Sequence, residues 1–196
     1  MVTEVRPRLV TADDLLDLSA DGFCGELIRG ELVEEMPPGF RHGKIVLKLG
    51  ALLLAFVEPR RLGTLVSDSG VWLERNPDTV RGPDLAFFRS ESVPLDTDIP
   101  GYADVVPDLV VEVHSPNDRR WQLHDKAHMW LYYGAEVVWV VLPERRSVDV
   151  YRSGQNTIRL SGGDVLDGLD VLPGFRCQLI DIFGPQPASA DQPAGE

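Results

Sequence analysis

The stretch Asp108-Leu-Val-Val-Glu-Val-His114 decides the fold, because it is an apolar strand with one acid beside it and another inside it. A second run, Val137-Val-Trp-Val-Val-Leu142, contains no polar residue. Such a run is typical of a central strand that is covered on both faces. The intervening segment from Arg120 to Tyr133 has helical character and stops at Gly134. We therefore expect a β-sheet with both runs in its core and a helix between them.

Shorter elements are predicted around this core. Thr11 is a candidate N-cap for a brief helix, since Asp13 and Asp14 follow in the first turn. The alternating segment 25–35 predicts a hairpin with its turn at Arg29-Gly30, and residues 40–56 have the apolar spacing of a helix. Further strands are expected at 62–66, 70–73, 85–88, 148–152 and 157–160. This order indicates an α+β or mixed α/β fold: a mixed sheet flanked by helices, with an added N-terminal hairpin.

Length and composition favour one domain in a cytoplasmic protein. The 196 residues are 43% hydrophobic, which allows a single sizeable core over residues 1–184. Residues 185–196 are small, polar and rich in proline, so we expect a disordered tail. No stretch approaches the roughly 18 apolar residues of a membrane span, and the N-terminus lacks an export signal. The two cysteines have neither zinc-site nor disulfide spacing, and we expect both to be free and buried.

The charge of the chain bears on its partners. A formal net charge of -12 argues against broad nonspecific binding to nucleic acid or to anionic membranes, because phosphate binding needs clustered lysine and arginine. A bound cation can reverse this locally, since it supplies positive charge where the acidic residues gather. DNA binding is therefore weakened as a hypothesis but stays open.

Two acids in apolar surroundings predict a metal site. Asp84 precedes one expected strand, and Glu112 interrupts another between valines. Carboxylates are almost never fully buried unless they are paired or bind a metal. Hard divalent cations such as Mg²⁺ and Mn²⁺ prefer oxygen ligands, and the backbone carbonyl of Val113 could add a third. Metal-assisted hydrolysis is the chemistry that this pattern indicates.

A lysine on the following helix could complete the site. Gln122, Lys126 and Trp130 are spaced four residues apart, so they share one face of the expected helix. If this face packs against the sheet, Lys126 is aimed at the strand ends that carry the acids. An exposed helix lysine is the more ordinary interpretation of this residue.

The pattern Pro83-Asp84 followed by Glu112-Val113-His114 resembles the PD-(D/E)XK nuclease superfamily, with His114 in the slot of the family lysine. Over about residues 11–183 the chain is similar to the Uma-type family of putative restriction endonucleases. The phrases that carry this similarity are Glu26-Leu-Ile-Arg-Gly-Glu-Leu-Val-Glu-Glu, Arg81-Gly-Pro-Asp84-Leu-Ala, Pro107-Asp-Leu-Val-Val-Glu112-Val-His-Ser-Pro-Asn-Asp118, Lys126 with Trp130 and Gly134, and Leu172-Pro-Gly-Phe175.

The resemblance implies a restriction-endonuclease-like core that cleaves phosphodiester bonds of DNA with Mg²⁺ or Mn²⁺. Asp84 and Glu112 would be metal ligands, and Lys126, drawn from the helix as in that family, would position the attacking water. Glu26 matches an N-terminal acidic position and could be a further ligand. His42 matches a histidine at the start of the long helix. Many nucleases of this fold act as dimers, so the resemblance also favours a homodimer.

Plainer interpretations exist for the additional residues and for the whole protein. Glu26 could be an exposed strand residue, His42 a polar residue at a helix start, and His114 a structural hydrogen-bond donor. At the position of Gln122 the resemblance leads us to expect an acid, which leaves the role of Gln122 open. Two neighbours of the site that could meet a phosphate are Arg119 and Arg120. The alternative functions are a catalytically inactive nuclease-fold protein that serves as a binding or assembly module, and a metal-dependent hydrolase of another substrate.

Overall fold

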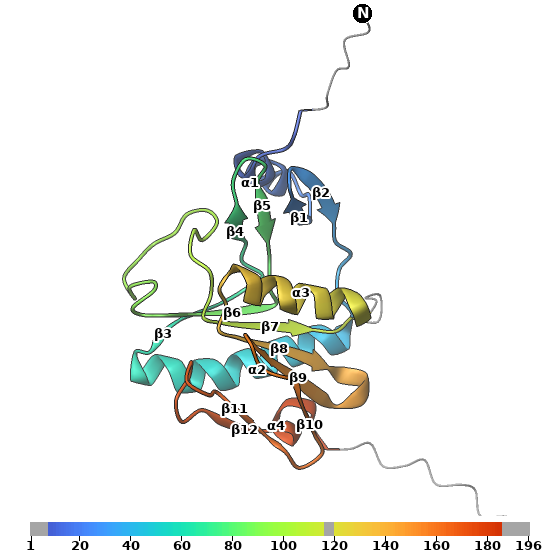
Figure 1. The fold of residues 1–196 in the computed structure, drawn as a ribbon, viewed down its shortest axis with the longest axis vertical. Coiled ribbons are helices and arrows are strands. Elements are labelled where there is room, and N and C mark those ends of the chain that lie inside the picture. The colour runs from blue at the N-terminus through green and yellow to red at the C-terminus, as the bar shows by residue number, and fades with distance from the viewer. Residues whose placement is uncertain (1–7, 116–119, 186–196) are drawn as a thin grey trace, which may run out of the picture.

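The computed structural model describes residues 8–115 and 120–185, apart from the side chains of Arg120 and Trp121. Its helices are α1 (Ala12–Ala20), α2 (Phe40–Val57), α3 (Arg120–Tyr133) and α4 (Leu179–Phe183). Its strands are β1 (Gly25–Ile28), β2 (Glu31–Glu34), β3 (Gly63–Ser67), β4 (Val71–Glu74), β5 (Thr79–Arg81), β6 (Leu85–Arg89), β7 (Leu109–Val113), β8 (Val137–Leu142), β9 (Ser147–Arg152), β10 (Ile158–Ser161), β11 (Val165–Asp167) and β12 (Arg176–Gln178). Figure 1 shows these elements along the chain.

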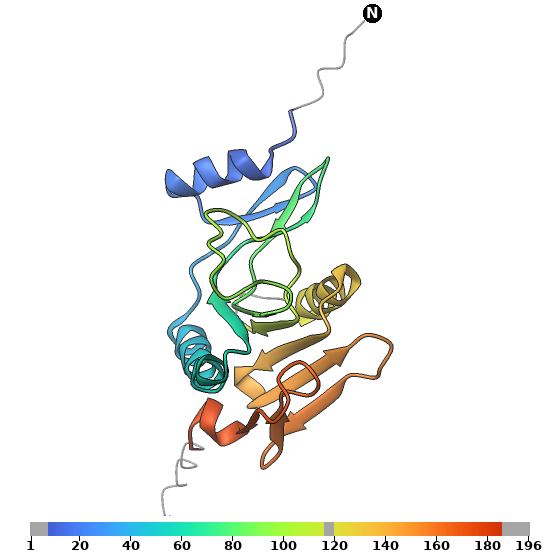
Figure 2. The ribbon, with the colours of Figure 1, turned by 90° about the vertical axis from the view of Figure 1, so that its left-hand side faces the viewer.

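The main sheet has six strands in the order β10-β9-β8-β7-β6-β3. Strands β7 and β8 are parallel and joined through α3, whereas the other neighbours are antiparallel. Every residue of β7 and β8 is buried, including Glu112, because α2 and α3 cover opposite faces of the sheet (Figure 2). The prediction of a mixed sheet flanked by helices is therefore confirmed.

A smaller sheet lies beyond one edge of this core (Figure 2), with the strand order β2-β1-β5-β4. The hairpin β1–β2 turns at Arg29 and Gly30, which both have positive φ, as a tight two-residue turn requires. Helix α1 starts at the predicted cap: Thr11 and Asp14 hydrogen-bond each other's backbone N–H groups. Leu27 of β1 packs in the small apolar cluster that joins α1 to this sheet.

Two short links connect the two sheets: residues 68–70 join β3 to β4, and residues 82–84 join β5 to β6. Residues 79–81 form β5, which pairs with both β1 and β4, although the sequence pattern predicted no strand there. Gly82 and Pro83 follow, and Asp84 leads directly into β6 of the main sheet. The link from β5 to β6 therefore places the Pro-Asp motif at the boundary between the sheets.

The C-terminal elements and one cysteine differ from the expectations. Strands β11 and β12 form a separate pair, and with α4 they help to cover the α2 face of the core. Cys177 is buried, but Cys24 is exposed, so the prediction of two buried thiols was wrong for Cys24. The tail predicted at 185–196 lies outside the described residues from position 186 onward. Among residues 8–115 and 120–185, no helix has the length and apolarity that are needed to cross a membrane.

Candidate active site

Asp84 lies where the small sheet meets the main sheet. Its Oδ2 accepts a 2.6 Å hydrogen bond from the backbone N–H of Val113, and its Oδ1 is 3.1 Å from His42 Nε2 on α2. Antiparallel pairing of Leu85 with Val111 brings Asp84 to the level of Glu112. The structure therefore brings the two predicted acids together on adjacent strands, and it adds His42 to them.

Glu112 is a buried carboxylate with two side-chain donors from α3. It is 3% exposed. Its Oε1 accepts a 2.7 Å hydrogen bond from the indole N–H of Trp130, and its Oε2 lies 3.2 Å from Lys126 Nζ. The predicted helix face of Lys126 and Trp130 thus does face the sheet, one turn apart, with Glu112 between their polar groups.

Lys126 has three acceptors around its ammonium group. Besides Glu112, Nζ lies 3.3 Å from Glu26 Oε1 and 3.2 Å from the carbonyl oxygen of Gly82. An ammonium group has three N–H donors, so these contacts match its full donor capacity. Lys126 is consequently held at one position between a carboxylate of the main sheet and a carboxylate of the small sheet.

Glu26, on β1, is surrounded by cations and an amide. It is 5% exposed, so its interpretation as an exposed strand residue was wrong. Its Oε2 lies 2.7 Å from Arg81 Nε, and its Oε1 accepts a 2.9 Å hydrogen bond from the Gly82 N–H as well as facing Lys126. Glu26 therefore belongs to the same buried cluster as the predicted catalytic residues.

Burial and charge set the protonation of this cluster. Burial raises the pKa of Glu112 to about 7, with Asp84 adding to the shift and Lys126 opposing it. Burial alone would lower the pKa of Lys126, but the carboxylates of Glu112 and Glu26 raise it above its usual value. The pKa of Glu26 is lowered because Lys126 and Arg81 outweigh its burial. Lys126 is therefore charged near neutral pH, and Glu112 can exchange a proton there.

The structure gives less support to the other residues that were predicted for the site. Val113 meets Asp84 through its backbone amide, whereas its carbonyl was the predicted ligand. His114 follows β7, and its Nε2 is buried without a hydrogen-bond partner in the described part of the chain. Gln122 is exposed one turn before Lys126. Arg119, and the side chain of Arg120, lie outside the described residues.

Sequence reasoning missed two contributions to the cluster. Arg81 was quoted only as part of a motif, and its contact with Glu26 depends on the pairing of β1 with β5. Glu35 lies near Glu26: partial burial and the Glu26 carboxylate, to which it is hydrogen-bonded, raise the pKa of Glu35. An alternating charged hairpin gives no signal for either contact. A strand prediction at 79–81 would have been needed to find the Arg81 contact.

The donor chemistry of Asp84 and Glu112 fits a hard divalent cation, because both supply carboxylate oxygens from adjacent strands. Each of their four oxygens already contacts a protein donor, but a carboxylate oxygen has a second lone pair to offer. Among residues 8–115 and 120–185, no three histidine, cysteine, aspartate or glutamate side chains are arranged to hold a metal. Two acids, with backbone or water oxygens, are therefore the donors that this part of the chain offers.

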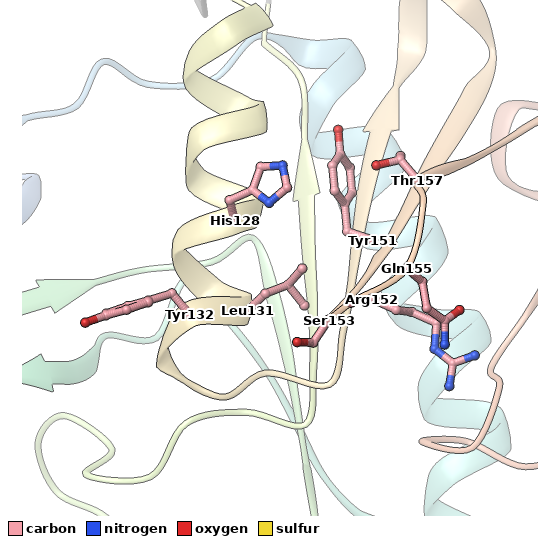
Figure 3. Close-up of a pocket in the computed structure, with 9 residues that line it drawn as sticks. His128, Leu131, Tyr132, Tyr151, Arg152, Ser153, Gln155 and Thr157 are labelled. Carbon is pink, nitrogen blue, oxygen red and sulfur yellow. The ribbon is translucent and has the colours of Figure 1, made fainter.

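Of two cavities in the structure, one reaches this cluster and the other does not. One of about 360 Å³ runs between α2 and β3, and its lining includes His42, Asp68 and Asp84. Burial and the neighbouring Asp84 raise the pKa of Asp68. The other, of about 210 Å³, lies between α3 and the β9–β10 turn and is lined by residues such as His128 and Tyr151 (Figure 3). Only the first cavity reaches the acidic site.

Comparison with known proteins places the chain in a family. The fold is shared with the crystal structure of a putative nuclease belonging to DUF820 from Anabaena variabilis, with a TM-score of 0.77 and 20% sequence identity. That match covers 89% of this chain and 97% of the other. The chain belongs to the Uma2 family, described as putative restriction endonuclease, whose model matches residues 12–180. No curated protein matches it. The family resemblance of the sequence motifs is confirmed.

Proposed function

We propose that this chain is a metal-dependent endonuclease that hydrolyses phosphodiester bonds of DNA. Asp84 and Glu112 hold Mg²⁺ or Mn²⁺, and Lys126 positions the attacking water. The observation that carries this proposal is the convergence of the three residues. Lys126 Nζ lies 3.2 Å from Glu112, and Asp84 binds the amide next to Glu112. Membership in a family described as putative restriction endonuclease supports DNA as the substrate.

The two acids are oriented by neighbouring side chains. Trp130 donates to Glu112 from α3, and His42 lies against Asp84 from α2. These contacts hold one oxygen of each carboxylate while a second lone pair stays available for a cation. A divalent cation bound there would lower the pKa of a bound water and neutralise charge on the phosphodiester. The carbonyl of Val113 is the third oxygen that we assign to it.

Lys126 acts as a hydrogen-bond donor in this scheme. Because Glu112 and Glu26 raise its pKa, it stays protonated and is no base near neutral pH. Its three N–H groups face Glu112, Glu26 and the Gly82 carbonyl in this structure, so one of these acceptors would give way to the water. The ammonium would orient this water so that its oxygen bonds to phosphorus while one P–O ester bond breaks. The proton of that water goes to solvent, and the departing oxygen takes one up. The charge that develops on phosphate faces the same ammonium.

Plasmid cleavage with Mg²⁺ or Mn²⁺ tests the proposal. We expect Asp84→Ala, Glu112→Ala and Lys126→Ala each to lower the cleavage rate by about 100-fold or more, since each removes a group that acts on the transition state. Asp104→Ala is the matched control, because that side chain is 68% exposed. Cleavage at the unaltered rate in the first two variants would refute the site.

A second function is favoured by one feature of the site. All four oxygens of Asp84 and Glu112 already contact protein donors, an arrangement that is complete without a cation. A nuclease-fold protein that acts only as a binding or assembly module would have such a site. Calorimetry with millimolar Mn²⁺ separates the two functions: absence of binding favours the module, and binding that is lost in Asp84→Ala favours the enzyme.

A further inference from the structure

The contacts of Glu26 are unlike those of the other two acids. Its two oxygens face Arg81, Lys126 and the backbone amide of Gly82 at 2.7–3.3 Å. Two cations and an amide dipole therefore surround this carboxylate, to which the neighbouring Glu35 is also hydrogen-bonded. A divalent cation at this carboxylate would meet two positive side chains at close range, and like charges at such distances repel strongly in a buried site. Glu26 is consequently a poor metal ligand, whatever binds at Asp84 and Glu112.

Arg81 is the second cation at Glu26, and its Nε lies 2.7 Å from Oε2 as an ion pair without hydrogen-bond geometry. Leu27 pairs with Val80 in the antiparallel β1–β5 ladder, so Glu26 and Arg81 stand opposite each other on neighbouring strands. The side chain of Arg81 is only 15% exposed, and such a pair is held more firmly than one on the surface. Arg81 also begins the link that ends at Asp84. The same backbone segment therefore positions one proposed metal ligand and the partner of Glu26.

Glu26 in turn restrains Lys126. The lysine side chain is long and flexible, and ordering it has a large entropic cost. Its three acceptors are Glu112, Glu26 and Gly82 O, of which the last two belong to the small sheet and its link. If phosphorus is to be attacked by a water held on Lys126, that ammonium has to stay within a few tenths of an ångström of one position.

We propose that Glu26 and Arg81 form a positioning pair, which fixes Lys126 against Glu112 and which binds no metal itself. This inference rests on the proposed role of Lys126 in cleavage, but the pair itself is defined by contacts alone. It makes the small sheet part of the active site. Lys126 is carried on α3 beside the main sheet, but the small sheet holds its ammonium group in position.

The first measurement follows the accessibility of Lys126 without any nuclease assay. The full-length protein is treated with acetic anhydride, and acetylation of the Lys126 peptide is timed by mass spectrometry. We expect Glu26→Gln, which preserves shape but removes the charge, to label at least about fivefold faster than the unaltered protein. Arg81→Ala should do the same, and Arg81→Lys should restore part of the protection. Glu34→Gln is the control, since Glu34 is exposed on the same hairpin.

Calorimetry and kinetics complete the experiment. Mn²⁺ affinity should change little in Glu26→Gln, whereas Asp84→Ala, which removes a proposed ligand, should abolish measurable binding. kcat should fall about tenfold or more with KM changed less than threefold, because the substrate-binding surface is intact. Thermal unfolding confirms that each variant is folded.

The outcomes separate the inference from the proposed function. Labelling of Lys126 at the unaltered rate in both Glu26→Gln and Arg81→Ala overturns the positioning pair, as does a tenfold loss of Mn²⁺ affinity. If the unaltered protein cleaves no DNA under any condition, the proposed function fails, yet faster labelling in Glu26→Gln and Arg81→Ala still supports the pair.

Discussion

The two sheets of this protein contribute to one site in different ways. In the main sheet, β7 and β8 are buried along their whole length, and Glu112 is a single acid in an apolar layer. In the small sheet, β2 is exposed throughout, and β1 is anchored to α1 by the few residues of a minor cluster. The main sheet supplies rigidity and Glu112, whereas the small sheet supplies the charged pair Glu26 and Arg81. Stability and catalysis should therefore respond differently to changes in the two regions.

The largest effect on stability is expected in the main sheet. Trp139 of β8 is completely buried and stacks on Phe175. Trp139→Ala should lower the free energy of unfolding by about 3–5 kcal/mol, because it opens a large cavity. Urea unfolding measures this change. Val33→Ala, on the exposed face of β2, is the control and should cost less than about 0.5 kcal/mol. Equal losses in the two variants would contradict the division of roles.

The buried acid Glu112 should make the free energy of unfolding depend on pH. Its pKa is raised from 4.5 to about 7 in the folded protein, so between these values the folded state binds more protons than the unfolded state. The contribution of Glu112 to stability is then greatest below pH 4.5 and falls as pH rises toward 7, by about 3 kcal/mol. Urea unfolding at pH 5 and 7.5 should show that Glu112→Gln removes most of this difference. An unchanged pH dependence in that variant would locate the proton elsewhere.

A substitution in the core of the small sheet tests whether this sheet contributes to catalysis. Leu27 is completely buried and lies next to Glu26. Leu27→Ala should cost about 2 kcal/mol, less than Trp139→Ala, yet lower kcat about tenfold because Glu26 shifts away from Lys126. Trp139→Ala, compared per folded molecule, should keep its kcat. Leu32→Ala, more exposed on the same hairpin, is the control. A variant of Leu27 with full activity would show that the small sheet is dispensable for catalysis.

The smallest effect is expected at the helix cap. Thr11 accepts a hydrogen bond from the Asp14 N–H, and Asp14 accepts one from the Thr11 N–H. Thr11→Ala should lower the free energy of unfolding by about 1 kcal/mol and leave cleavage unchanged, since α1 has no residue in the site. Thermal unfolding and the plasmid assay measure the two quantities. Lost cleavage would mean that α1 reaches further into the site than its contacts indicate.

Much of the main sheet could be predicted from local patterns. The run from Val137 to Leu142 has no polar face, and residues 40–56 have helical spacing, so periodicity alone located β8 and α2 to within a residue. The face shared by Lys126 and Trp130 was predicted from helix geometry in the same way. Strand β5 was missed because it has three residues and lies between proline and glycine, where local signals favour a turn.

Sequence by itself determined the fold class, the family and the residues from which a site could be built, because apolar periodicity and short motifs are local properties of the chain. Only the tertiary structure decided which of those residues meet. The contacts of Asp84 with Val113, of Glu112 with Trp130 and of Glu26 with Arg81 and Lys126 join segments that are far apart in the chain or lie in different sheets. Their geometry follows from strand register and helix packing, and no local pattern encodes it.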